Sequence, residues 1–299
     1  KAGALGRLAS IFASHKTKVV VHTYHGNVFD GYFSPMKSMI FIWIERFLGY
    51  FSSGIISISK AQKIELSNKY GIAKADKIHV IPLGFELQHF GEDLALKRQK
   101  FRLEFNLSDD EVVVGITGRL TAIKNHKLFL ESVSLCKQRE CPSFKVFVFG
   151  DGELMEELVL FTKELGLIVG RSGKTLGEED VIFTSWRRDI DYINAGADIC
   201  ALSSMNEGTP VSIIEAMASG MAVITTKVGG VEDFVNNGEN GLICEQDVTK
   251  FAESLEKLIS DRSLRKSLGE KAQVAVTQQF DYRRLVSDVD VLYKRLLKN

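Results

Sequence analysis

Short runs of β-branched and aliphatic residues alternate with longer stretches of helical periodicity along most of the chain. In the N-terminal third, an apolar helical pattern at residues 36–51 and a shorter one in KAQKIELSNKY separate three such runs, KVVVH, GIISIS and KIHVIP. Strands that alternate with helices are typical of βαβ units and parallel sheets. The pattern therefore predicts a parallel α/β unit of three strands at this end of the chain.

A longer series of strands follows the Pro and Gly of IPLGFE, residues 81–86. The charged stretch EDLALKRQKFRLEF predicts a linker and an entry helix. After it the pattern predicts six strands with helices between them: EVVVGIT, FKVFVFG, DVIFT, ADICAL, MAVITT and GLICE. Six strands form a complete doubly wound domain. We therefore expect an α/β protein with an incomplete, truncated N-terminal domain at residues 1–83 and a full domain at residues 84–279.

The last segment, residues 280–299, predicts a single amphipathic helix. Apolar residues recur in it at helical spacing: Leu285, Val286, Val289, Leu292, Tyr293 and Leu296. Such a stripe is expected to bury one face of the helix against the rest of the protein.

The composition is that of an ordinary globular protein, with 45% hydrophobic and 25% charged residues. The 38 basic and 38 acidic residues cancel, which disfavours nucleic acid as a partner. The four cysteines form no CxxC pair, which favours a reducing, cytoplasmic compartment. His22 and His25 have no further ligand nearby, so a strand end is expected there rather than a zinc site. Glu45 and Arg46 interrupt the apolar stretch at 36–51, which favours a buried or interfacial helix over a membrane span.

The stretch EGTPVSIIEAMASG, residues 207–220, follows the predicted strand ADICAL. Thr209 is a suitable N-cap, Pro210 suits the first helical position and Gly220 is a typical C-terminal stop. The helix then begins at the carboxyl end of a parallel strand, where open α/β sheets bind ligands. Its free amide groups and its positive dipole end favour a phosphate or a partly negative sugar oxygen.

The two glutamates of this stretch differ in how readily an ordinary role explains them. Glu207 precedes the helix, and an acidic residue there commonly does no more than complement the helix dipole. Glu215 lies two turns into the helix among apolar neighbours, where a carboxylate needs a partner, although a solvated helix residue is the simpler alternative. Adjacent hydroxyl groups of a ribose are a suitable partner, because a carboxylate accepts two hydrogen bonds at once.

Three other loops are expected on the same rim. GITGRLTAIKNH carries Arg119 and Lys124, which are usually solvated when taken alone but could neutralise a diphosphate at a strand end. FVFGDGEL contains a Gly-x-Gly turn that is explained as often by a tight turn as by a ligand. In SWRRDI, Trp186 and Arg188 could flank a base or simply pack and carry surface charge.

Two further motifs complete the candidates. GRSGKT, residues 170–175, lacks the spacing and the flanking elements of a P-loop and is interpreted as a flexible surface insertion. In the first unit, HTYHGNVFDGYF places His25 directly after a strand, where it could donate to a hydroxyl group or be an ordinary strand-end histidine.

Together these residues resemble the retaining, nucleotide-sugar-dependent glycosyltransferases of the family 4 type, which have the two-domain GT-B fold. The resemblance rests on the spacing of Glu207 and Glu215 around Gly-Thr-Pro, on the pair Arg119 and Lys124, and on TKVGGVED after the helix. HTYHGNVFDGYF and ISISKAQKIEL are similar to stretches of the first domain of that family, so nearly all of the chain is covered.

The resemblance implies a role for each candidate. Arg119 and Lys124 would hold the donor diphosphate, Glu215 the ribose and Glu207 the donor sugar, with His25 near its reacting carbon. The other donor-binding positions that it implies are Gly118, Gly150, Gly152, Arg187, Gly208, Thr209, Pro210, Val211 and Ser212. It also implies that the final helix crosses back to the N-terminal domain.

The reaction implied is transfer of a sugar, with retention, from a UDP- or GDP-sugar to a hydroxyl acceptor in bacterial polysaccharide or glycolipid assembly. The acceptor would be a sugar or a lipid-linked sugar, and no cofactor or metal is expected because protein cations stabilise the leaving diphosphate. A GT-B-fold nucleotide-sugar epimerase and a catalytically silent partner subunit remain as alternatives. The apolar helix at 36–51 would suit peripheral contact with the inner face of a membrane.

Overall fold

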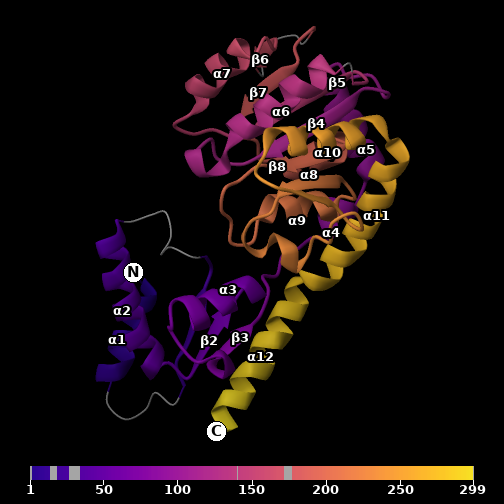
Figure 1. The fold of residues 1–299 in the computed structure, drawn as a ribbon. Helices are drawn as coiled ribbons and strands as arrows, with labels where there is room; N and C mark the ends of the chain where they lie inside the picture. Colours follow the sequence, from indigo (N-terminus) through magenta and orange to yellow (C-terminus); the bar gives the residue numbers. More distant parts are fainter. Residues whose placement is uncertain (1, 14–18, 27–33, 140, 172–176, 299) are drawn as a thin grey trace. The chain divides into compact units, whose positions relative to one another are not determined.

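The computed structural model describes residues 2–13, 19–26, 34–139, 141–171 and 177–298. Its backbone contacts divide the chain into two compact units, and Figure 1 labels most of their elements. The first unit comprises Lys1–Phe85, Glu207–Thr209 and Gln279–Asn299, and the second comprises Glu86–Asn206 and Pro210–Gln278.

The first unit contains a parallel three-stranded sheet in the order β1-β2-β3. The strands are β1 (Val21–Tyr24), β2 (Gly54–Ser57) and β3 (Ile78–Val80), and the helices are α1 (Ala2–Phe12), α2 (Pro35–Phe51), α3 (Lys60–Ile64) and α12 (Tyr282–Lys298). A π-helical turn, Glu65–Lys69, extends α3, and a 3-10 turn, Ala75–Lys77, precedes β3. The three strands and the helices α2, α3 and α12 are those that the periodicity predicts.

A reciprocal cap fixes the start of α3. The Ser59 hydroxyl accepts a hydrogen bond from the Gln62 amide at 3.0 Å, and the Gln62 side chain accepts one from the Ile58 amide at 3.0 Å. Both donors would otherwise lack partners at a helix start. This cap ends β2 abruptly and turns the chain into the helix.

Helix α12 packs along the first sheet, and Figure 1 shows it running beside β2 and β3. Leu292 is buried against Ile56 and Ile81, and Leu285, Val289 and Leu296 pack around them. Two members of the predicted stripe do not join this contact, since Val286 is 64% exposed and Tyr293 is 45% exposed. The buried face is therefore narrower than the helical spacing indicates.

Helix α2 presents its apolar side chains to solvent. Its exposed large residues are Met36, Met39, Ile40, Phe41, Trp43, Ile44, Phe47, Tyr50 and Phe51. Glu45 turns inward, where it accepts hydrogen bonds from Arg7 at 2.6 Å and from the Tyr24 hydroxyl at 2.5 Å. The expectation of a buried helix is wrong for this face, and an interfacial helix is the alternative that remains. Within the parts of the chain that the structure describes, no helix has the length and apolarity needed to cross a bilayer.

The second unit is built on a seven-stranded parallel sheet in the order β10-β9-β8-β4-β5-β7-β6. The strands are β4 (Val112–Thr117), β5 (Phe144–Phe149), β6 (Val169–Arg171), β7 (Val181–Ser185), β8 (Ile199–Leu202), β9 (Ala222–Thr226) and β10 (Leu242–Cys244). The helices are α4 (Gln88–Gly91), α5 (Leu94–Glu104), α6 (His126–Gln138), α7 (Met155–Glu164), α8 (Ile190–Gly196), α9 (Val211–Ala218), α10 (Val248–Ser260) and α11 (Arg262–Gln279).

The core of the second unit lies on both faces of this sheet. The central strands are almost wholly buried, as continuous apolar runs are in parallel sheets. On one face Phe101 and Phe105 of the α5 region meet Phe147, with ring centroids 5.6 and 4.8 Å apart. Gly196 allows this packing, because a Cβ there would lie 2.1 Å from the Phe101 ring.

Strand β6 was not predicted. Gly170 and Arg171, interpreted from the sequence as the start of a surface insertion, pair with Ile182 and Phe183 of β7 at the edge of the sheet. The rest of GRSGKT, residues 172–176, lies outside the described residues. The strand is only three residues long, too short for a period-2 pattern to be visible.

Candidate functional site

The second sheet changes direction between β4 and β8. From β4 the chain proceeds to β5 and β7 on one side, and it later returns to place β8 on the other side. In this architecture ligands usually bind at the carboxyl edge of the sheet, beside two such strands. The loop after β4 carries Arg119 and Lys124, and the loop after β8 leads to α9.

Hydrogen bonds join these two loops. The Met205 amide donates to the Ile123 carbonyl at 2.8 Å, and the Ser203 hydroxyl donates to the Lys124 carbonyl at 3.0 Å. Ser203 is completely buried, so this contact is shielded from water. The backbone that carries Lys124 is therefore fixed against the strand that leads to α9.

The two cations of the first loop differ in their surroundings. Arg119 is exposed, and its guanidinium has no hydrogen bond or ion pair with any other described residue. Lys124 is half-buried and ends a short 3-10 turn, Ala122–Lys124. Asn125 follows with φ 49° and ψ 47°, a left-handed conformation that turns the chain into α6. Lys124 thus lies two residues before the start of α6.

Glycines hold the loops after β4 and β5 in close contact. A Cβ on Gly150, whose φ is +144°, would lie 1.9 Å from the Gly118 carbonyl oxygen. A Cβ on Gly152 would lie 2.5 Å from the Leu120 carbonyl oxygen. Gly150 and Gly152 are therefore explained by backbone packing, whereas a Cβ on Gly118 would meet only the Lys124 side chain at 3.7 Å.

Helix α9 begins one residue later than predicted. Pro210 is the N-cap and Val211 the first helical residue, so the expected cap by Thr209 is wrong. The Thr209 hydroxyl is buried and has no hydrogen-bond partner among the described residues. Val211 is exposed and Ser212 half-buried at the start of the helix. The predicted stop is confirmed, since Gly220 follows the C-cap residue with φ +76°.

Glu215 is the least compensated group at this rim. Its neighbours Ile214 and Ala216 are fully buried, and its carboxylate has no hydrogen bond or ion pair within the described parts of the chain. Burial raises its pKa to about 7, because a low-dielectric environment disfavours the charged form. A ligand that donates hydrogen bonds to this carboxylate would relieve the cost of burying it.

Arg187 is already engaged by acidic side chains. Its guanidinium donates to Glu104 and, at 2.6 and 2.8 Å, to Asp189, and it lies over the Phe105 ring at 5.6 Å. These hydrogen bonds raise the pKa of Arg187 well above its ordinary value. The side chain links the loop after β7 to α5, while its neighbour Trp186 is 60% exposed.

Two features of the rim were not singled out from the sequence. The Ser185 hydroxyl donates to Asp151 at 2.7 Å and so connects the loops after β5 and β7, which lowers the pKa of Asp151. His126, the first residue of α6, is buried with neither ring nitrogen hydrogen-bonded to a described residue. Burial and the nearby Lys124 lower its pKa to about 4, so the imidazole is neutral. Only its place directly after Lys124-Asn125 could have drawn attention to it.

The remaining candidates belong to the first unit. His25 is exposed directly after β1, and a Cβ on Gly208 would lie 3.5 Å from the His25 carbonyl oxygen. Glu207 and Gly208 are both half-buried. Residues 27–33, which are the whole NVFDGYF stretch of the resemblance, lie outside the described residues. Within the described part of the chain, no group of three or more His, Cys, Asp and Glu side chains could hold a metal ion.

Comparison with known protein families agrees with this arrangement. Residues 97–275 match the family model described as glycosyl transferases group 1, and residues 1–89 match that of glycosyltransferase family 4. The chain is 27% identical over 302 residues to UDP-Gal:alpha-D-GlcNAc-diphosphoundecaprenol alpha-1,3-galactosyltransferase of Escherichia coli, covering 100% of this chain and 74% of the relative. It is also 27% identical over 317 residues to the capsular polysaccharide biosynthesis glycosyltransferase CapM of Staphylococcus aureus, covering 100% of this chain and 75% of the relative.

Solved structures show the same fold. HepE from Anabaena in complex with UDP superimposes with a TM-score of 0.84 at 23% identity, covering 98% of this chain and 76% of that one. The C-terminal domain of the group 1 family protein LpcC from Francisella tularensis matches with a TM-score of 0.55 at 25% identity, covering 66% of this chain and 99% of that one. These likenesses confirm the predicted α/β, GT-B fold with two Rossmann-like parts.

Proposed function

Because the chain belongs to the group 1 glycosyl transferases, with a family 4 glycosyltransferase region at residues 1–89, we propose that it moves a sugar from a nucleotide-sugar donor to a hydroxyl acceptor. The donor is a UDP- or GDP-sugar, and the solved relative that binds UDP favours the uridine nucleotide. One relative is named for a GlcNAc-diphosphoundecaprenol acceptor and another for capsular polysaccharide biosynthesis, which favours a sugar or a lipid-linked sugar as the acceptor.

One observation carries the donor assignment: Glu215 is a half-buried carboxylate with no partner among the described residues. It lies on α9, which follows β8, one of the two strands between which the sheet changes direction. The two hydroxyl groups of a ribose match the two oxygens of an ionised carboxylate. Glu215 is therefore assigned to the nucleoside of the donor.

The leaving diphosphate requires positive charge as its bond to the sugar breaks. Arg119 is exposed and unpaired among the described residues, and Lys124 is held by the contact between its loop and Ser203. The free amide groups at the start of α9 add to the positive electrostatic potential of Arg119 and Lys124. Charge that is fixed in place before the reaction stabilises the transition state without reorganisation, so the proposed reaction draws on no metal ion or other cofactor.

We further propose that the configuration at the anomeric carbon is retained. In a same-face displacement the departing phosphate oxygen accepts the proton of the acceptor hydroxyl, so the protein need not supply a general base. By family resemblance, His25 and Glu207 contact the donor sugar and Gly208, Thr209 and Pro210 supply backbone around it. These roles rest on the resemblance.

The acceptor is proposed to be presented at the inner, cytoplasmic face of a membrane. The Escherichia coli relative is named for an acceptor linked to diphosphoundecaprenol, a lipid. In this chain α2 exposes an apolar stripe that includes Trp43 and Tyr50, residue types that favour the boundary between lipid and water. Its Glu45 turns inward, so it adds no carboxylate to that stripe.

Turnover of the Lys124→Ala variant tests the proposal. Losing a cation directed at the leaving group should lower kcat by roughly a hundredfold or more. Lys127→Ala is the matched control, because Lys127 is an exposed lysine three residues further on, paired with Glu157 at 2.6 Å. Transfer from UDP- and GDP-sugars to a lipid-linked acceptor is measured for both variants. An unchanged kcat in Lys124→Ala, or no transfer from any nucleotide sugar by the wild type, would refute the assignment.

A further inference from the structure

A second cavity lies at the amino edge of the second sheet. Its volume is about 580 Å³, within the range of small-molecule sites. It is lined by the residues that begin β4 and β9, by the ends of α8 and α10, and by the starts of α5 and α11. The candidate donor loops follow the opposite, carboxyl ends of these parallel strands. Because β4 has six residues, roughly 20 Å of strand separates the two edges.

One wall of this cavity carries basic side chains that have few acidic partners. Arg262 is exposed, and its guanidinium has no hydrogen bond or ion pair with another described residue. Lys266 reaches Glu270 only at 3.8 Å. The neighbouring Arg265 is different, since it donates to the Leu258 and Ile259 carbonyl groups and is thus used in capping α10. Arg262 and Lys266 are therefore free to bind an anion.

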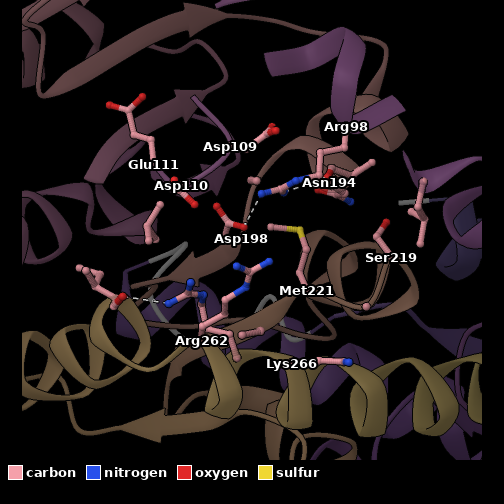
Figure 2. Close-up of a pocket in the computed structure, with 18 of the residues that line it drawn as sticks. Arg98, Asp109, Asp110, Glu111, Asn194, Asp198, Ser219, Met221, Arg262 and Lys266 are labelled. Atoms are coloured by element: carbon pink, nitrogen blue, oxygen red, sulfur yellow. Dashed lines mark hydrogen bonds and ion pairs between the residues drawn. The ribbon is translucent and has the colours of Figure 1, made fainter. Parts of the chain in front are cut away.

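The opposite wall carries carboxylates. Figure 2 shows Asp109, Asp110 and Glu111 on the other side of the cavity from Arg262 and Lys266. None of these three carboxylates has a hydrogen bond or ion pair with a described residue. The Asp198 carboxylate, which also lines the cavity, already has partners. Arg98 forms an ion pair with it at 2.8 Å, and the Val113 amide donates a hydrogen bond to it at 2.8 Å. The free carboxylates are suitable acceptors for hydroxyl groups.

A buried amide between the walls lacks a partner. Asn194 lines the cavity and is only 4% exposed, and its Nδ2 atom donates to no described residue. Leaving a buried donor unpaired is costly, and nearly all such groups in proteins have a partner. The Nδ2 atom is covered in the empty cavity, so the Asn194 side chain has to rotate to donate to a hydroxyl, carboxylate or phosphate oxygen of a ligand.

We infer that this cavity is a second small-molecule site, distinct from the candidate donor site, that takes a polyhydroxylated anion of the sugar phosphate class. Arg262 and Lys266 bind the phosphate, the carboxylate wall accepts hydrogen bonds from the sugar hydroxyl groups, and Asn194 donates to an oxygen between them. A ligand that has only a phosphate, or only sugar hydroxyl groups, leaves one wall of the cavity without a partner.

Calorimetric titration of the full chain with glucose 6-phosphate at low ionic strength tests this inference. Arg262→Gln and Lys266→Gln should each weaken binding at least tenfold, as expected for losing one charge-assisted hydrogen bond. Lys271→Gln, an exposed lysine on the same helix that does not line the cavity, should leave binding unchanged. Lys124→Gln should also bind normally, because it alters only the donor rim.

Further ligands and a further variant distinguish a sugar phosphate site from a site for phosphate alone or for sugar alone. Inorganic phosphate and free glucose should each bind at least tenfold more weakly than glucose 6-phosphate. Asn194→Leu should weaken binding without lowering the Tm, because it removes an unpaired donor at similar volume. The inference is overturned if glucose 6-phosphate does not bind, if Lys124→Gln rather than Arg262→Gln abolishes binding, or if inorganic phosphate binds equally well.

Discussion

The proposed contact between Glu215 and the ribose predicts that nucleotide binding depends on pH. Its pKa is raised to about 7 by burial, and ribose hydroxyl groups donate only to the ionised form with full strength. The affinity for UDP should therefore rise as pH increases through this value, by about tenfold between pH 6 and pH 8. Calorimetry on wild type and Glu215→Gln at both pH values measures the difference, since the titration of UDP itself is common to both. Parallel pH profiles for the two proteins would contradict the assignment of Glu215.

The same residue affects the stability of the free protein. An unfolded chain ionises Glu215 near the ordinary value of 4.5, whereas the folded protein retains the proton up to about pH 7. Between these values the folded state binds the extra proton, so the free energy of unfolding falls as pH rises across this window. Water still reaches the carboxylate, which limits the effect to about 1–2 kcal/mol. Glu215→Gln should lack this part of the slope in urea denaturation.

The contacts of an individual residue could be predicted only where the residues that it contacts are close to it in the sequence. The apolar neighbours of Glu215 are adjacent along the helix, so its lack of a partner was foreseeable. Arg187 was assigned to the base by resemblance, but its partner Glu104 lies 83 positions away, beyond what spacing can reveal. Thr209 was expected to cap α9 from residue type alone, whereas the cap position depends on the backbone at Pro210.

The loops after β4 and β5 form one packed element, and Gly150 holds it together. Gly150→Ala would place a Cβ 1.9 Å from the Gly118 carbonyl oxygen. The backbone would have to shift, and we expect the free energy of unfolding to fall by about 3 kcal/mol. Gly118→Ala is the matched control, with an expected loss below about 1 kcal/mol, because its Cβ meets only a flexible side chain at 3.7 Å. Equal urea midpoints for the two variants would show that the loops do not pack as described.

Helix α2 is the element proposed to contact lipid. Trp43→Glu and Phe47→Glu would each place a carboxylate in the exposed stripe, and we expect the fraction bound to anionic liposomes to fall roughly tenfold. Leu160→Glu serves as the control, because Leu160 is 60% exposed on α7 in the second unit. Flotation with equal binding by all three variants would show that α2 is not the contact.

At the level of elements, the sequence predicts whether each long segment is a helix or a strand. It does not predict which face of that element is exposed to solvent. Continuous β-branched runs identified the central strands because both of their faces are buried. Strand β6 has only three residues and depends on pairing with β7, so no local signal marks it. For residues 36–51 the sequence predicts a buried or an interfacial helix without deciding between the two. The inward turn of Glu45 depends on Arg7 and Tyr24, which are distant in sequence.

At the scale of the whole molecule, the chain consists of two units with separate cores. The α12 contact in the first unit and the aromatic cluster in the second share no residues. Arg119, Lys124 and Glu215 all belong to the second unit, whereas His25 and Glu207 belong to the first. Nucleotide binding and sugar transfer should therefore be separable, because the groups proposed to bind the nucleotide all belong to the second unit.

A fragment of residues 86–279 tests this separation. The corresponding C-terminal domain of LpcC was crystallised on its own, and the second unit here has a continuous core around its seven-stranded sheet. We expect the fragment to unfold cooperatively and to bind UDP within about threefold of the full chain, since the affinity is set by contacts that it retains. It should catalyse no transfer, because His25 is absent. Circular dichroism melting and calorimetry measure the two properties, with Glu215→Gln in the fragment as the control for specific binding. A folded fragment that does not bind UDP would place essential nucleotide contacts in the first unit and would refute the assignment of the donor nucleoside to the second.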